Sequence, residues 1–177
     1  MAALAGSKNK SRIFTPAFIL HKRQTDPIVK NTTQVPNSPN TSGAALHITD
    51  EAEACAAVLV ACLRSSEIYG MTENAAFYNT IKSRNVFQGR DAETLVTTAE
   101  QYFEQAGSPA ALIDAAYSAI REQTRLPLFY QCLDVMLSDG IVTPQEHKIF
   151  LYMKSKFRVD NDVAWSALEV LVAKNKL

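Results

Sequence analysis

Apolar residues recur at helical spacing from residue 50 to residue 177, and helix-capping residues interrupt them at short intervals. Asp50 stands three residues before Glu53, as in a capping box, and opens a run that carries Val58, Leu59 and Cys62 on one face. Further helix starts follow at Thr72, Asp91, Ser108-Pro109, Thr124, Thr143-Pro144, and Asp160 or Asn161. No segment alternates like a strand bounded by turns. The pattern predicts about seven helices in one compact all-α bundle.

Two parts of this bundle show a weak internal similarity. Residues 61–63 match residues 131–133, and Thr72 then aligns with Thr143. One interpretation is a pair of helix–loop–helix halves related by a pseudo-twofold axis; the other is chance similarity among common helix residues. In the last helix, Trp165 stands between the expected buried positions, so we expect it to be half-exposed and open to a partner.

The first 46 residues have a different character. They contain Pro16, Pro27, Pro36 and Pro39, and residues 31–43 are almost without apolar side chains. Such a segment buries too little surface to offset the entropy of ordering it. We therefore expect a flexible basic tail over residues 1–46 and a helical domain over residues 47–177. An organelle transit peptide, leading to a stromal location, is the alternative interpretation of the tail.

Charge and composition narrow the class of protein. Residues 1–49 carry a net charge of +5 and residues 50–177 a net charge of −5. An acidic helical body is a poor match to nucleic acid. No apolar run reaches the roughly 18–20 residues that span a bilayer. Cys55, Cys62 and Cys132 all lie in apolar helical runs, as expected of buried thiols in a reducing compartment. These features predict a cytoplasmic protein that is not an integral membrane protein.

The most informative motif is the acidic loop from Ser138 to Glu146. With Gly140 at position 6 of a calcium-binding loop, Asp139 and Glu146 fall in register, but Val135 and Leu137 occupy positions that must supply oxygen ligands. The motif is therefore not an EF-hand. Two interpretations remain: a purely structural one, in which Gly140 ends a helix with positive φ and Glu146 closes a capping box, and a cation or partner site to which Asp139 contributes an oxygen.

An apolar helix that ends in Asp-Gly and is followed by Thr-Pro-x-Glu, as in residues 132–146, resembles the TerB-like family of tellurite-resistance proteins. The resemblance spans roughly residues 50–175. It implies pseudo-twofold helical halves, acidic residues at the Asp-Gly loops, and roles in chemical stress, metal-ion sensing and membrane-linked stress complexes without enzymatic activity. By position it assigns Asp139 and Glu146 to the acidic loop. In the first half Tyr69 precedes Gly70 where Asp is expected, so Glu67 and Glu73 are the nearby acids.

Catalytic groups are not apparent. His147 is a candidate metal ligand or a solvated side chain, and Cys132 on an apolar stripe is expected to be an inert thiol with a raised pKa. No nucleotide-binding motif supports an organic cofactor. We therefore predict a non-enzymatic protein. The first hypothesis is a stress-response module that binds a divalent cation weakly through Asp139, Glu146, Glu67 and Glu73. The alternative is an ion-free adaptor that holds a protein partner.

Overall fold

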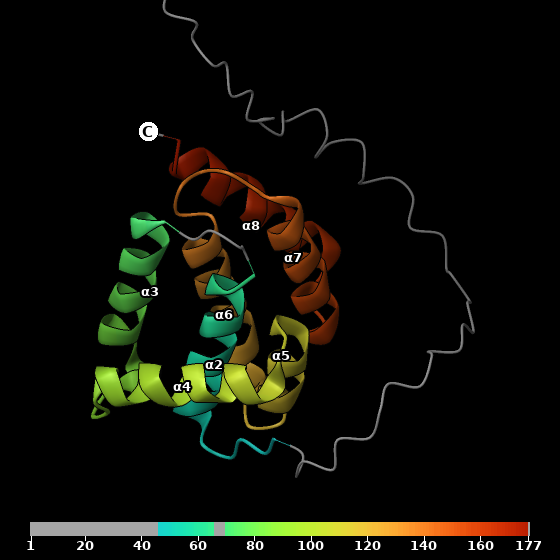
Figure 1. Cartoon of the computed structure of the whole chain (residues 1–177). Coiled ribbons are helices and arrows are strands. Elements are labelled where there is room, and N and C mark those ends of the chain that lie inside the picture. The colour runs from blue at the N-terminus through green and yellow to red at the C-terminus, as the bar shows by residue number, and fades with distance from the viewer. Residues whose placement is uncertain (1–45, 66–69, 177) are drawn as a thin grey trace, which may run out of the picture. The chain divides into compact units, whose positions relative to one another are not determined.

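The computed structural model describes residues 46–65 and 70–176. Glu67 and the predicted flexible tail, apart from its last residue, lie outside these ranges. Within them the chain forms seven α-helices and a short 3-10 helix, with no strand (Figure 1). The elements are α2 (Glu51–Leu63), α3 (Met71–Ser83), η1 (Asn85–Phe87), α4 (Ala92–Ala106), α5 (Pro109–Tyr117), α6 (Glu122–Met136), α7 (Pro144–Lys156) and α8 (Asn161–Lys174). The all-α prediction is confirmed. No helix of the described segments has the length and apolarity to cross a membrane.

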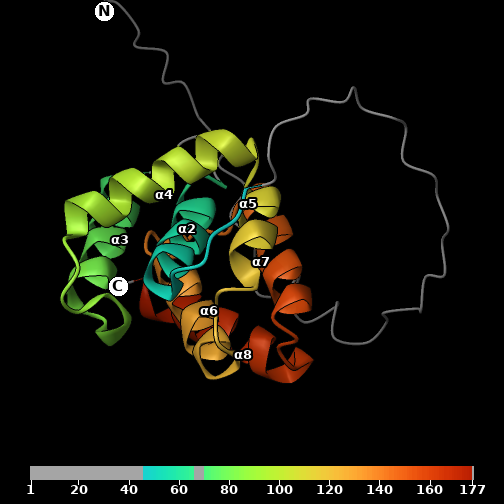
Figure 2. The ribbon, with the colours of Figure 1, turned by 90° about the horizontal axis from the view of Figure 1, so that it is seen from below.

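Helix α2 is the centre of the fold. Every residue from Ala54 to Leu63 is at most 4% exposed, and the helix contacts α3, α4, α5 and α6. Figures 1 and 2 show α2 enclosed between α4 on one side and α6 on the other. Its sequence explains this placement, because the small residues Ala54, Ala56, Ala57 and Ala61 let neighbouring helices approach closely on several faces.

Polar groups at the start of α2 fasten it to two other helices. Glu53 accepts a hydrogen bond of 2.7 Å from the Tyr102 hydroxyl on α4. Glu51 accepts bonds from the backbone N–H of Arg121 (3.1 Å) and from the Thr124 hydroxyl (2.8 Å) at the start of α6. Thr124 is therefore not the N-cap that the sequence predicts. Arg121 precedes the helix, and the Thr124 hydroxyl binds a carboxylate of α2 instead.

Most predicted helix starts are confirmed, since the side chains of Asp50, Asp91, Ser108, Thr143 and Asp160 each accept a bond from a backbone N–H of the first turn. The prediction for α3 is wrong by two residues. Its N-cap is Gly70, and Thr72 lies inside the helix. The carboxylate of Glu73, three residues on, accepts the Gly70 N–H, which is the half of a capping box that does not require a side chain at the N-cap.

The two helix–loop–helix halves are α2–α3 and α6–α7, and they share the same plan. Each pair is joined by seven residues, 64–70 and 137–143, and α3 and α7 both have 13 residues. Glu73 and Glu146 both stand three positions after the N-cap, and the buried Phe77 and Phe150 both stand seven positions after it. Gly70 therefore corresponds to Thr143, and the sequence alignment of Thr72 with Thr143 is wrong.

The connection between α6 and α7 is held against the end of α8. The Asn175 side chain donates a hydrogen bond of 2.7 Å to the Leu137 carbonyl oxygen. Gly140 has a φ of 74°, as predicted, but α6 ends earlier, with Leu137 as its C-cap. A Cβ atom at Gly140 would lie 2.8 Å from the Asn175 carbonyl oxygen. Both the backbone conformation and the close approach thus require glycine there.

Trp165 is buried, at 5% exposure, and meets the Phe150 ring edge-to-face with 5.0 Å between centroids. The expectation of a half-exposed Trp165 is wrong, because α8 turns its Ala164–Trp165 edge toward α7. The three cysteines are free and buried, as predicted.

Enlarging a small residue of α2 should destabilise the fold. We expect Ala57→Leu, at a fully buried position, to lower the free energy of unfolding by about 1–3 kcal/mol through overpacking. Ala75→Leu, at an exposed position of α3, is the matched control and should change it by less than about 0.5 kcal/mol. Urea denaturation measures both. Equal midpoints for the two variants would contradict the central position of α2.

Gly140→Ala tests the contact between the α6–α7 connection and α8. Gly89 has a similar φ of 77°, and a Cβ added there would meet nothing within 4 Å, so Gly89→Ala measures the conformational cost alone, about 1–2 kcal/mol. Gly140→Ala should lower the unfolding free energy by more than that, because the Asn175 carbonyl must also move. Thermal unfolding compares the two; indistinguishable losses would argue against the close approach.

Candidate acidic site

Two buried carboxylates stand at the starts of the second helices of the two halves. Glu73 is 5% exposed and Glu146 is 3% exposed. Each closes back on the N-cap residue: Glu73 Oε2 accepts the Gly70 N–H, and Glu146 Oε2 accepts the Thr143 N–H at 2.7 Å. The Glu146 N–H donates in turn to Thr143 Oγ1 at 3.2 Å, which completes the predicted capping box. The structural interpretation of Glu146 is thus confirmed.

Asp139 differs from these two because its side chain is exposed. It lies in the α6–α7 connection, where Oδ1 accepts a hydrogen bond of 2.9 Å from the Ile141 N–H. This bond shapes the turn around Gly140. The other carboxylate oxygen, Oδ2, is not used by this turn.

Neighbouring carboxylates affect the ionisation of both buried glutamates. Burial raises the pKa of Glu73, the Gly70 N–H opposes the rise, and the charge of Asp139 adds to it. Burial likewise raises the pKa of Glu146 against the hydrogen bonds from Thr143, and the charges of Glu73 and Asp139 raise it further. Like charges shift a pKa in this way only over short distances. The two halves therefore bring Glu73, Glu146 and Asp139 into one region of negative potential.

Carboxylate oxygens are the ligands that calcium and magnesium prefer, so the donor chemistry of this region suits a divalent cation. The capping bonds use only Oε2 of each glutamate, and Oε1 can accept another ligand. The arrangement of these side chains suits a cation less well than their chemistry does. In the described segments no three His, Cys, Asp or Glu side chains are grouped so that they could hold a metal ion. Glu67, the fourth predicted ligand, lies outside those segments.

His147 and Cys132, the other residues singled out in the sequence, both pack against neighbouring side chains of the fold. The His147 ring packs against Phe150 and Trp165, with centroids 6.2 and 5.9 Å away. Cys132 is fully buried, and burial together with the neighbouring Cys62 raises the pKa of its thiol, as predicted. The burial of Glu73 is not among the sequence predictions. Its signal is Gly70-x-x-Glu73, which repeats Thr143-x-x-Glu146 and marks a second helix start of the same kind.

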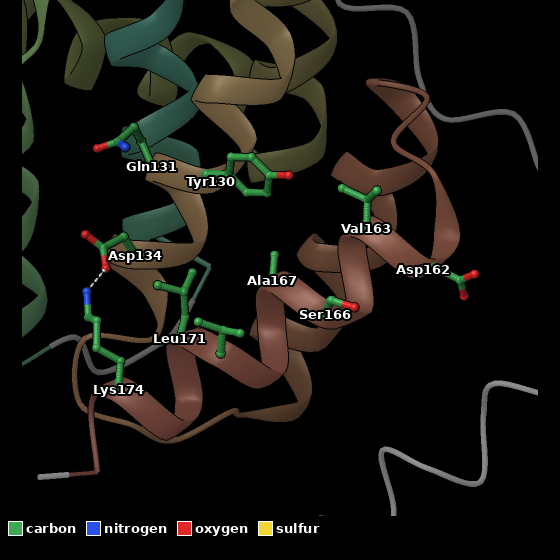
Figure 3. A pocket seen from close by; sticks show the side chains of 10 residues that line it. Tyr130, Gln131, Asp134, Asp162, Val163, Ser166, Ala167, Leu171 and Lys174 are labelled. Atoms are coloured by element: carbon green, nitrogen blue, oxygen red, sulfur yellow. Dashed lines mark hydrogen bonds and ion pairs between the residues drawn. The ribbon is translucent and has the colours of Figure 1, made fainter.

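A second surface feature is a groove of about 700 Å³ between α6 and α8 (Figure 3). Tyr130 and Gln131 line it from α6, and Val163, Ala167 and Leu171 line it from α8. An ion pair between Lys174 Nζ and Asp134 Oδ1, 2.5 Å apart, joins the two helices at one end. The groove offers mainly apolar contacts, in contrast to the acidic region at the helix connections.

Comparison with known proteins identifies the family. The family model described as "Tellurite resistance protein TerB" matches residues 52–168, from the first turn of α2 into α8. Neither the curated proteins nor the solved structures gave a match. The matched region contains both helix–loop–helix halves and the acidic residues Glu73, Asp139 and Glu146. The chain belongs to the TerB family of tellurite-resistance proteins.

Proposed function

We propose that this protein is a non-enzymatic stress-response module of the tellurite-resistance type, which binds a divalent cation weakly at its acidic helix connections. The observation that carries the proposal is that burial raises the pKa of both Glu73 and Glu146, that the charge of Asp139 raises both further, and that the charge of Glu73 adds to the rise at Glu146. A divalent cation would relieve this repulsion, and proteins commonly place such strained polar groups at functional sites.

The same arrangement argues for low affinity. Glu73 and Glu146 are held by their capping bonds, so each offers a cation one further oxygen without disturbing its helix start. Asp139 must turn an exposed side chain toward them. Glu67, on the other connection, is the further ligand that we assign to the site. Few preorganised protein oxygens leave much of the ion's shell to water, which keeps binding weak.

An ion-free adaptor is the second candidate, and the groove between α6 and α8 favours it. Partner proteins commonly bind in apolar grooves between helices. The contrast between a basic segment before residue 50 and an acidic body after it adds an electrostatic means of recruiting a partner. We propose that either module acts in the cytoplasm, where free thiols such as the three buried cysteines remain reduced.

Titration of the full chain with calcium, magnesium and zinc tests the cation proposal. At a free ion concentration of ten times Kd, a bound ion should add about 1.4 kcal/mol to the unfolding free energy and raise Tm by a few degrees. Asp139→Asn should weaken this effect, whereas Glu104→Gln, at an exposed acid of α4, should preserve it. Calorimetry and thermal shift measure both. No saturable shift with any ion at millimolar concentration, or an unchanged response of Asp139→Asn, would eliminate the cation site.

Glu146→Gln tests whether burial and the neighbouring charges oppose the ionisation of Glu146. The raised pKa means that folding favours the protonated carboxyl, so its contribution is fully present below the unfolded pKa and lost as pH rises through the folded pKa. Gln keeps an acceptor oxygen for the Thr143 N–H and carries no charge. We expect Glu146→Gln to be at least as stable as the parent protein at pH 7, with a difference that shrinks below pH 4.5.

Glu146→Ala is the companion variant. It removes the capping acceptor as well as the charge, so it should cost about 0.5–2 kcal/mol at pH 7. Urea midpoints measured from pH 4 to pH 8 separate the two effects. A Gln variant that is as unstable as the Ala variant at pH 7 would show that the charge of Glu146 is favourable in the fold.

A further inference from the structure

Helix α8 carries two stripes, an inner one that is apolar and an outer one made of two valines, an alanine and a serine. The inner stripe, Ala164, Trp165, Leu168 and Val172, is buried. The outer stripe, Val163, Ser166, Val170 and Ala173, is exposed along its whole length, with Val163 at 38% and Val170 at 64%. These outer positions are spaced by three, four and three residues, which is the spacing of the seam of a coiled coil. A helix whose only role was to cover the hydrophobic core of its own domain would need the inner stripe alone.

The outer stripe borders the groove between α6 and α8. Val163, Ser166 and Val170 line that groove together with Tyr130 of α6 (Figure 3). A helix laid along the outer stripe would therefore contact both α8 and the half-buried Tyr130. The face is long enough for several turns, since about 18 Å of helix separates Asp162 from Lys174.

Charge is distributed unevenly along this helix. Asp160 and Asp162 stand at its start, and Lys174 and Lys176 stand at or just beyond its end. All four are exposed. A partner helix that ran parallel to α8 with the same charge order would bring acid against acid and base against base. A partner that ran antiparallel would bring acid against base at both ends.

We propose that a second copy of this chain is the occupant of this face, packed antiparallel along α8 about a twofold axis near Leu168. Such an interface uses the same patch on both copies, so every favourable contact occurs twice. Val163 then lies opposite Ala173 of the partner subunit, and Val170 lies opposite Ser166 of the partner subunit. Each large residue thus faces a small one, which lets the two helices approach closely.

The flanking charges fit the same register. Asp162 lies beside the partner's Lys176, and Asp160 lies beside the partner's Lys174. Lys174 already pairs with Asp134 in its own chain, so the second acid extends an existing ion pair. Glu169 lies near the partner's Glu169, the one like-charged contact of this register, and it has an interaction within its own chain. The interface does not involve the acidic connections, so the dimer proposal can be tested independently of the cation proposal.

Sedimentation velocity of the full chain, from micromolar to several hundred micromolar, tests the dimer. We expect a concentration-dependent monomer–dimer equilibrium. Val170→Asp should raise the dimer Kd by at least about tenfold, because it places a charge in the seam. Tyr78→Asp changes a residue of α3 that is 41% exposed and does not line the groove, so it should leave the Kd unchanged. A monomer at every concentration, or a Val170→Asp variant that dimerises normally, would overturn the proposal.

A charge exchange tests the antiparallel register, with circular dichroism to show that each variant keeps the helical fold. Asp162→Lys and Lys176→Asp should each raise the dimer Kd about fivefold or more, because each creates two like-charged contacts. The double variant Asp162→Lys/Lys176→Asp restores opposite charges and should return the Kd to that of the parent chain. Failure of the double variant to recover dimerisation would overturn this register.

Discussion

The burial of α2 is the constraint from which the rest of the structure follows. A helix with solvent on no side must be narrow, and α2 is narrow because five of its residues are alanines packed against their neighbours. This allows α4, α5 and α6 to contact one helix at the same time. Since α6 is the counterpart of α2 in the second half, their close packing also brings the connections that follow them, and hence the starts of α3 and α7, into one region.

That convergence has an electrostatic consequence. A glutamate three residues after an N-cap stabilises a helix start when it is considered alone. Here both glutamates are buried, and burial raises the pKa of each. The charge of Asp139 raises both further, and the charge of Glu73 also raises the pKa of Glu146, so ionisation is opposed at both positions. A capping glutamate that stabilises its own helix start is thus harder to ionise where two such helix starts lie close together. A conflict of this kind between local and tertiary preferences is typical of functional sites.

The features that can be predicted from the sequence are those that depend on residues close together in the chain. Asp50, Asp91, Ser108, Thr143 and Asp160 can be identified as caps because a capping residue acts on its own first turn. The prediction for Thr124 is wrong because its hydroxyl binds Glu51, 73 residues away. The prediction for Thr72 is wrong because the N-cap, Gly70, has no side chain that could mark it as a cap, and the capping bond there runs from the Gly70 N–H to the carboxylate of Glu73.

Tertiary relations are harder to predict. The sequence predicts a half-exposed Trp165 because this residue stands between the expected buried positions of α8, and nothing local says which face of the helix meets the core. The Asp-Gly and Thr-Pro-x-Glu motifs identify Asp139 and Glu146, whereas Glu73 stands out only as an acid near Gly70. Burial of both glutamates depends on the meeting of the two halves, which no local pattern encodes.

The central claim is that Glu73, Glu146 and Asp139 share one electrostatic region. Titration of the side-chain carboxyl carbons of Glu73 and Glu146 by NMR, in the parent protein and in Asp139→Asn, measures this directly. The account predicts that both glutamates titrate above their ordinary pKa, that Asp139→Asn lowers both values, and that a bound divalent cation lowers them further. Ordinary pKa values for the two glutamates, unmoved by Asp139→Asn, would contradict it.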